Sequence, residues 1–293
     1  MTATNLKHGF IQADPELQHP DATTLHKKLD IPIMSGHRAN FAGYRFHNEH
    51  FDKIVERTAR FQVGYEDQCS ATFYWDLFNA TYAFRDKLTR VIDLGVFMGG
   101  SSVILAGCAH EFNLQIDLID IGSKYLHFGH ERIRRIYPEL ADKVRLYNGD
   151  LPTYVRDVIL QEQGGCILVH HDGAHDFSQV VRDFCSLSYV KDQIHSVAIQ
   201  DTNLRGQPHY PHAGRFVDAA VYAIFGFDMK FAPMGATFTA DDTLMTTPNQ
   251  YGGNYFLPDM PEGWFVPLGQ NTFRYPHPTM PPPLEAFIDP AQR

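Results

Sequence analysis

Short apolar segments alternate with longer amphipathic stretches through the middle of the chain. Five of the apolar segments have the length and composition of buried strands, and most of them end in a carboxylate; they span residues 91–94, 114–120, 144–150, 166–172 and 196–201. Between them apolar residues recur at helical spacing, as they do from Phe177 to Tyr189. Regular alternation of strands and helices predicts a parallel sheet with helices on both faces.

The flanking regions are less regular. Residues 1 to about 45 are polar and rich in turn formers, and helical spacing follows over 51–61 and 71–88. After a helix at 215–222, Phe227 to Pro233 is expected to form a sixth strand. The seventh strand has two candidates, which are Ala236 to Thr239 and Asn254 to Leu257, and the proline-rich tail from Tyr275 is expected to be an extended surface segment.

These patterns predict a Rossmann-like α/β fold with a doubly wound, mostly parallel, seven-stranded sheet. It would carry an N-terminal helical arm and an irregular C-terminal extension. We divide the chain into residues 1–88 (arm and substrate-side helices), 89–240 (core) and 241–293 (inserted loop, last strand and tail). With no clear boundary between these parts, we expect one domain overall.

Composition narrows the class of partner. A net charge of −9 argues against a nucleic-acid or anionic-membrane surface, because such surfaces need clustered Lys and Arg. No apolar run has the length of a membrane span, no signal-peptide core is present, and the four cysteines lack metal spacing. We therefore expect a cytoplasmic protein that acts on a small molecule, with the arm and the tail available for contacts in a homo-oligomer.

The stretch Asp93-Leu94-Gly95-Val96-Phe97-Met98-Gly99-Gly100 joins the first strand to the next helix. Glycines allow a ligand to approach the backbone, and amides at a helix start attract anionic groups. The dinucleotide fingerprint G-x-G-x-x-G would need glycine where Phe97 stands. The spacing instead resembles the first motif of the class I S-adenosylmethionine-dependent methyltransferases. The resemblance implies that Asp93, Gly95, Phe97, Gly99, Gly100 and Ser101 hold the methionine end of that cofactor.

Carboxylates recur at the ends of successive strands, where ligands of open parallel sheets collect. Asp120 ends the second strand, at the position from which an acid accepts hydrogen bonds from ribose hydroxyls. Asp150 ends the third, and the resemblance assigns it to the adenine end of the cofactor. Asp172 and Asp201 follow the fourth and fifth strands, so we expect these acids to converge on one cleft.

The ends of the fourth and fifth strands carry the candidate chemistry. Oxygen ligands from adjacent strand ends suit Mg²⁺ better than zinc. Asp172-Gly173-Ala174-His175, followed by Gln200-Asp201-Thr202, resembles metal-assisted O-methyltransferases of the macrocin and cephalosporin-pathway type. The resemblance implies Mg²⁺ on Asp172, Gln200 and Asp201, with Asp172 also beside the cofactor and His175 as the general base. Gln200 replaces a glutamate of that group, which removes one negative charge from the site.

Two functions follow from these observations. The first is an S-adenosylmethionine-dependent methyltransferase that methylates an oxygen of a small hydroxylated metabolite or sugar, with catalytic residues His175 and Asp172 and possible assistance from Mg²⁺. The alternative is a non-catalytic or regulatory adenosylmethionine-binding protein in which the metal site has degenerated. A nicotinamide oxidoreductase is disfavoured by Phe97 and by the lack of a recognisable catalytic arrangement for hydride transfer.

Overall fold

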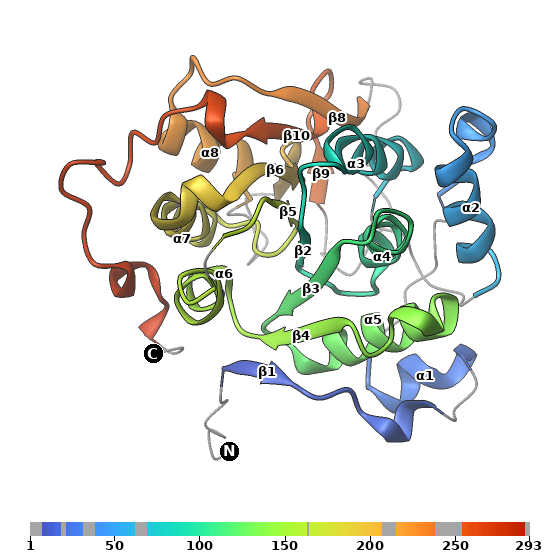
Figure 1. Cartoon of the computed structure of the whole chain (residues 1–293). Helices are drawn as coiled ribbons and strands as arrows, with labels where there is room; N and C mark the ends of the chain where they lie inside the picture. The colour runs from blue at the N-terminus through green and yellow to red at the C-terminus, as the bar shows by residue number, and fades with distance from the viewer. Residues whose placement is uncertain are drawn as a thin grey trace.

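A computed structural model gives the fold (Figure 1), and it describes residues 8–18, 22–31, 39–61, 69–162, 164–206, 215–237 and 254–290. The helices are α1 (Ala22–Lys28), α2 (Glu49–Thr58), α3 (Ala71–Phe84), α4 (Gly100–Phe112), α5 (Ser123–Ile136), α6 (Leu151–Tyr154), α7 (Phe177–Leu187) and α8 (Val217–Phe225). The strands are β1 (Gly9–Ile11), β2 (Arg90–Leu94), β3 (Gln115–Asp120), β4 (Val144–Asn148), β5 (Ile167–His171), β6 (Ile194–Gln200), β7 (Leu204–Gly206), β8 (Ala232–Thr237), β9 (Asn254–Phe256) and β10 (Pro261–Pro267).

Within the described residues, the central sheet has eight strands in the order β1-β4-β3-β2-β5-β6-β10-β8. The five strands from β4 to β6 in this order are parallel, whereas β1, β10 and β8 pair antiparallel with their neighbours. Strand order reverses at β2 and β5, which lie side by side although two strands separate them in the sequence. In open α/β sheets, the crevice for ligands forms at the carboxyl ends of the strands at such a reversal.

Helices cover both faces of the sheet, and successive strand residues alternate between two apolar clusters. Val91 packs into the cluster that includes α2, α3, α4 and α5, and its neighbour Ile92 packs into the cluster that includes α6, α7 and α8. The same division is visible in Figure 1, where α3, α4 and α5 lie on one side of the sheet and α6 and α7 on the other. This arrangement confirms the predicted Rossmann-like, doubly wound and mostly parallel α/β fold.

The structure corrects the predicted fold at both edges of the sheet. The part of the chain that the structure describes places eight strands in this sheet and not the expected seven, because β1 of the supposed arm pairs with β4. The sixth strand is β8, which begins at Ala232, so the expectation of a strand from Phe227 was wrong. The strand between β6 and β8 is β10, a segment that we did not predict, since its proline, glutamate and glycine obscure the apolar pattern.

Two other expectations for the C-terminal third change. Residues 254–256 do form a strand, β9, but it pairs with β7 in a separate two-stranded sheet. The proline-rich tail is not an extended surface segment throughout, because Leu284, Phe287 and Ile288 are buried. Leu284 and Phe287 belong to the apolar cluster that contains α6, α7 and α8.

Candidate functional site

The glycine turn after β2 lies directly against the end of β5. Gly95 has a φ of +88°, and a Cβ atom there would lie 2.1 Å from the carbonyl oxygen of Asp172. Gly99, with a φ of +69°, is the residue before α4, which starts at Gly100. Phe97 also has a left-handed backbone, with a φ of 42°. The predicted cofactor turn and the predicted catalytic loop are therefore in backbone contact.

Asp120 braces the turn from the end of β3. Its Oδ2 accepts hydrogen bonds from the backbone N–H groups of Val96 at 2.9 Å and Phe97 at 3.4 Å, and its Oδ1 accepts from Gly122 at 2.7 Å. Burial raises the pKa of Asp120 to about 6, and these backbone N–H groups limit the rise. A carboxylate has about four lone-pair sites, so hydroxyl donors can still be accepted. The contact of Asp120 with ribose stays a prediction.

Asp93 and Ser101 lie beneath the turn. The Asp93 side chain is fully buried and contacts His170 Nδ1 at 2.6 Å. It also accepts hydrogen bonds from the hydroxyls of Ser101 and Ser102 at the start of α4. This network ties β2, β5 and α4 together. Asp93 and Ser101 thus support the turn from beneath, and their expected contact with the cofactor stays a prediction.

Asp150 caps α6 at the end of β4. Its Oδ1 accepts from the backbone N–H of Thr153 at 2.9 Å, the usual contact of a helix-capping aspartate. Its Oδ2 is buried and has no hydrogen-bond partner among the described residues. Buried polar atoms are normally paired. An oxygen in this state is suited to a donor from a ligand, in keeping with the predicted contact with adenine.

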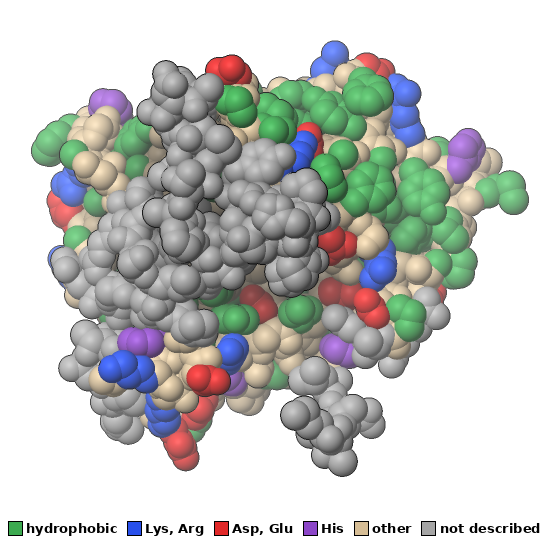
Figure 2. All heavy atoms as spheres, turned by 180° about the vertical axis from the view of Figure 1, so that it is seen from behind, with side chains coloured by type: hydrophobic (Ala, Val, Ile, Leu, Met, Phe, Trp, Pro, Cys, Tyr) green, Lys and Arg blue, Asp and Glu red, His purple; other side chains and the backbone are tan. Residues whose placement is uncertain are grey.

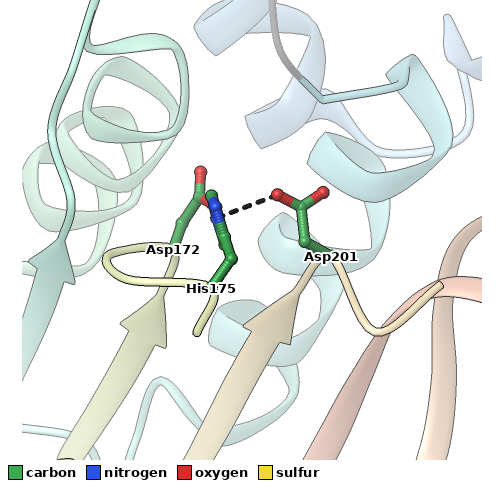
Figure 3. A group of neighbouring side chains, drawn as sticks. All are labelled: Asp172, His175 and Asp201. Carbon is green, nitrogen blue, oxygen red and sulfur yellow. Dashed lines mark hydrogen bonds and ion pairs between the residues drawn. The ribbon is translucent and has the colours of Figure 1, made fainter. Parts of the chain in front are cut away.

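Asp172, His175 and Asp201 meet at the ends of β5 and β6 (Figure 3). His175 Nε2 lies 2.9 Å from Asp201 Oδ2 and 3.3 Å from Asp172 Oδ1. Asp201 takes a left-handed backbone conformation, with a φ of 61°, which is costly for a residue with a side chain. The structure therefore brings together the three residues that the sequence predicted for acid–base chemistry or metal binding.

Arg215, which we did not predict, fixes the imidazole of His175. Its guanidinium Nη1 lies 2.8 Å from His175 Nδ1, and because arginine only donates, Nδ1 accepts and Nε2 carries the hydrogen. Burial lowers the pKa of His175, but Asp201 and Asp172 outweigh it and raise the pKa to about 9. Arg215 opposes that rise, since it occupies the side where a second ring proton would point. Nε2 is thus protonated in either charge state.

A second unpredicted group, Glu262 on β10, lies behind Gln200. The Glu262 carboxylate is 3% exposed and accepts hydrogen bonds from Ser70 N at 2.9 Å and Ala236 N at 3.1 Å. It also accepts one from the Ser70 hydroxyl, and Gln200 Nε2 lies 3.4 Å from its Oε1. Burial raises the pKa of Glu262 to about 7, while its bonds to Ser70 and Ala236 act against the rise.

The amide of Gln200 lies between two carboxylates. In the orientation just described, its oxygen faces the Asp172 carboxylate. Rotated by 180°, Nε2 instead donates to Asp172 Oδ1 at 3.1 Å and Oδ2 at 2.5 Å. Burial raises the pKa of Asp172, and its contact with His175 opposes the rise. No motif pointed to Glu262, Arg215 or Ser70, because each reaches the site from a distant part of the chain.

The donor set fits a hard divalent cation. One ligand atom from each of Asp172, His175 and Asp201 lies within 4.8 Å of the others. His175 is the weakest of the three as a ligand, because its Nε2 holds a hydrogen while Arg215 occupies Nδ1. Two carboxylates and the amide oxygen of Gln200 remain, and such oxygen ligands suit Mg²⁺. The residues present are therefore compatible with the predicted set of Asp172, Gln200 and Asp201.

Two surface properties bear on the expected partners. Figure 2 shows Lys and Arg side chains interspersed with Asp and Glu on the face that it presents. Within the described part of the chain, no helix is long and apolar enough to cross a membrane. The expectations of a cytoplasmic location, of a homo-oligomer and of no nucleic-acid partner stay predictions.

Comparison with known proteins identifies the central segment. Residues 92–193 match a family model described as a methyltransferase domain. No curated protein sequence matches the chain. The matched segment begins in β2 and extends to the start of β6, so it contains the glycine turn, Asp120, Asp150, Asp172 and His175. Gln200, Asp201, Arg215 and Glu262 lie outside it.

Several solved structures are similar to this chain. An O-methyltransferase from Bacillus cereus in complex with SAH is 12% identical and has a TM-score of 0.45, with 78% of this chain and 94% of that chain covered. CalS11, a calicheamicin methyltransferase, is 13% identical with a TM-score of 0.45, and 89% of this chain and 95% of that chain are covered. The O-methyltransferase TomG from Streptomyces achromogenes is 12% identical with a TM-score of 0.41, and coverage is 88% and 91%.

The assignment rests on the family match and on the geometry of the chain itself. The matched segment carries the strand, glycine turn and helix that predicted the cofactor, and it contains the strand-end acid proposed for ribose. The match identifies residues 92–193 as a methyltransferase domain, in agreement with the resemblance of this segment to the class I S-adenosylmethionine-dependent methyltransferases.

Proposed function

We propose that the protein transfers the methyl group of S-adenosylmethionine to a hydroxyl oxygen of a small acceptor, such as a hydroxylated metabolite or a sugar. The observation that carries the proposal is the contact between the cofactor turn at Gly95 and the loop that holds Asp172 and His175. An acceptor bound beside these groups would have its hydroxyl close to the methyl donor. Resemblance to metal-assisted O-methyltransferases of the macrocin type supports the choice of oxygen.

The reaction needs alignment and the removal of one proton. A lone pair of the acceptor oxygen attacks the methyl carbon, the carbon–sulfur bond breaks, and its electrons neutralise the sulfonium. The proton of the acceptor hydroxyl must be transferred to a group of the protein. We assign its acceptance to the group formed by Asp172, His175 and Asp201, in which a proton is already shared between the imidazole and two carboxylates. Because the pKa of Asp172 is raised, this carboxylate is a better proton acceptor than an exposed one.

His175 has a more limited role in this proposal than the sequence suggested. With Nε2 protonated and Nδ1 held by Arg215, it cannot take the hydroxyl proton directly in the arrangement described. It instead holds Asp172 and Asp201 at a fixed separation, because its Nε2 hydrogen lies between their carboxylates. When Mg²⁺ is bound by Asp172, Asp201 and Gln200, it supplies positive charge that lowers the pKa of an acceptor hydroxyl.

Product formation tests the proposal. The protein is incubated with methyl-labelled S-adenosylmethionine and a panel of catechols, phenols and free sugars, and S-adenosylhomocysteine and labelled product are measured. Transfer to an oxygen supports the proposal, and transfer to nitrogen or carbon contradicts it. Calorimetry with S-adenosylmethionine, S-adenosylhomocysteine and NAD checks the cofactor. Cofactor binding with no turnover on any acceptor, with or without Mg²⁺, would favour the regulatory alternative.

A further inference from the structure

We propose that His8 is a cofactor-binding residue, which reaches the adenine of S-adenosylmethionine from the N-terminal strand β1 and donates a hydrogen bond to a ring nitrogen beside the adenine amino group. Asp150 accepts from that amino group in the same complex. The inference rests on the proposed function only for its cofactor, and it depends neither on the acceptor nor on a metal ion. The family match begins at residue 92, so it assigns no role to β1.

The N-terminal strand extends the ligand-bearing edge of the sheet by one strand. β1 pairs antiparallel with β4, with Gly9 opposite Asn148 (Figure 1). Because the two strands run in opposite directions, the beginning of β1 lies at the carboxyl end of β4. His8 directly precedes β1 and therefore lies at the same edge as Asp150, which follows the last residue of β4 by two positions.

Four neighbouring strands, β2, β3, β4 and β1, place the expected cofactor contacts in order along this edge. The turn at Gly95 follows β2, Asp120 ends β3, Asp150 follows β4, and His8 precedes β1. Adjacent strands lie about 4.8 Å apart, so β1 lies about two strand spacings beyond Asp120. A nucleoside with its ribose at Asp120 and its base over the end of β4 therefore extends toward β1.

Two polar atoms at this corner of the sheet have no hydrogen-bond partner among the described residues. They are Nδ1 of His8 and Oδ2 of Asp150, and both atoms are buried. Burial raises the pKa of Asp150, the bonds to Thr153 lower it, and His8 is near enough to lower it further. Because buried polar atoms are normally paired, these two atoms are suited to one polar ligand.

The two atoms complement the amino edge of adenine. A carboxylate oxygen only accepts hydrogen bonds, and a neutral imidazole donates through one of its ring nitrogens. Adenine presents an amino donor next to a ring nitrogen that accepts. A guanine or hypoxanthine base carries a carbonyl oxygen in place of that amino group, so the same pair disfavours it.

Phe10 holds β1 against the sheet. Its ring lies opposite Tyr147 of β4 in an edge-to-face arrangement, with ring centroids 5.6 Å apart. The guanidinium of Arg145 lies 5.0 Å from the centre of the same ring. Both contacts are attractive. His8 is therefore presented by a strand that is paired and packed.

Affinity for S-adenosylhomocysteine, measured by calorimetry, tests the inference without any turnover. His8→Ala should weaken binding about 3- to 10-fold, the effect of losing one hydrogen bond between neutral groups. His8→Gln, whose amide can donate, should retain most of the affinity. His195→Ala is the matched control, because His195 lies near the start of β6, at the opposite edge of the sheet. Its effect should be less than about twofold on the same scale.

Cofactor analogues separate contact with adenine from an effect on folding. The 1-deaza and 7-deaza analogues of S-adenosylhomocysteine each lack one of the ring nitrogens beside the amino group. The wild type should bind one of them about 3- to 10-fold more weakly, and His8→Ala should bind that analogue as tightly as the wild type does. In wild-type protein labelled with ¹⁵N-histidine, S-adenosylhomocysteine should shift the ring resonances of His8. That shift tests the inference even where His8→Ala does not fold.

Several results would overturn the inference. They are unchanged affinity in His8→Ala, an equal loss in His195→Ala, an equal loss by His8→Ala for S-adenosylhomocysteine and both deaza analogues, and His8 resonances that do not respond to the bound nucleoside. If the wild type methylates an acceptor while His8→Ala binds the cofactor as tightly, the inference is wrong and the proposed methyl transfer stands. If binding responds as expected but no acceptor is methylated, the role of His8 stands and the proposed function fails.

Discussion

Two groups of residues at the strand ends differ in how they are held: the cofactor half, which is the turn at Gly95 with Asp120 and Asp150, and the acid half, which is Asp172, His175 and Asp201 with the Arg215 and Glu262 side chains beside them. In the cofactor half, Asp120 and Asp150 are held by backbone N–H groups, among them those of Gly122 and Thr153, which lie two and three residues further along the chain. In the acid half, the partners are distant in the chain: Arg215 contacts His175 from 40 residues away, and Ser70 donates its backbone N–H and its hydroxyl to Glu262 from 192 residues away. The contacts of the cofactor half form wherever the local sequence of strand, turn and helix forms. Those of the acid half form only when the whole sheet is assembled.

This difference has a consequence for charge. Backbone amides are present wherever a turn follows a strand, so Asp120 and Asp150 keep their partners in the folded protein regardless of distant residues. In the acid half, Asp172, Asp201 and Glu262 are near one another, and the described cations close to them are His175 and Arg215. Substitutions there should alter catalysis and protonation more than cofactor binding, and substitutions at the turn should do the reverse.

The largest effect is expected for Asp172→Asn. Loss of the carboxylate removes a proton acceptor, and methyl transfer should fall about 10²- to 10⁴-fold, the usual contribution of general acid–base catalysis. The affinity for S-adenosylmethionine, measured by calorimetry, should change by less than about threefold. Asp289→Asn is the control, because Asp289 pairs with Arg182 at 3.0 Å away from the strand ends and should keep full activity. If Asp172→Asn loses cofactor affinity to the same extent as turnover, the two halves do not have separate roles.

The next effect tests the turn. Gly95→Ala should lower the free energy of unfolding by about 2–5 kcal/mol, because it combines a left-handed backbone with a Cβ 2.1 Å from the Asp172 carbonyl oxygen. Urea denaturation measures this change. Gly43→Ala is the matched control, since nothing lies within 4 Å of a Cβ there, and it should stay within about 0.5 kcal/mol of the wild type. Equal stabilities for the two variants would mean that the turn does not touch β5.

A smaller effect is expected at Asp120. Asp120→Ala should weaken S-adenosylmethionine binding about 10- to 100-fold, in line with hydrogen bonds to a charged group. Burial raises the pKa of Asp120 to about 6, so in the wild type cofactor affinity should fall as the pH falls through 6, where the carboxylate takes up a proton. Calorimetry between pH 5 and 8 measures both effects. The affinity of Asp120→Ala for S-adenosylmethionine should not change between pH 5 and 8. If the affinity of the wild type is equally independent of pH, Asp120 does not contact the ribose.

The smallest effect concerns Arg215. Arg215→Met removes the group that occupies Nδ1, so the pKa of His175 should move up from about 9, whereas Arg215→Lys should retain most of the cationic influence. Histidine resonances followed against pH measure the change. Because the pKa of His175 in the folded protein lies above the ordinary histidine value of 6.5, the stabilisation is present below pH 6.5 and is lost as the pH rises through about 9. A downward shift in Arg215→Met would mean that Arg215 assists protonation instead of opposing it.

Much of the fold could be predicted from the sequence because its signals are local. The strands β2, β3, β4, β5 and β6 follow from buried apolar runs, and the turn at Gly95 follows from glycine spacing. The edges of the sheet were predicted poorly. β10 contains Pro261, Glu262 and Gly263, and only its position between β6 and β8 turns this mixed sequence into a buried strand.

By itself, the sequence determined the ligand-bearing edge of the sheet and the acids on it, since the carboxyl ends of parallel strands lie together in any such fold. Tertiary structure decided what those acids do. Asp93 is turned inward to His170, while Arg215 reaches His175 and Glu262 lies beside Gln200 from distant segments of the chain. The physical reason is that a buried polar group is paired with whatever group lies next to it in the folded structure. A partner that is distant in the chain has no fixed sequence spacing from which the pairing could be predicted.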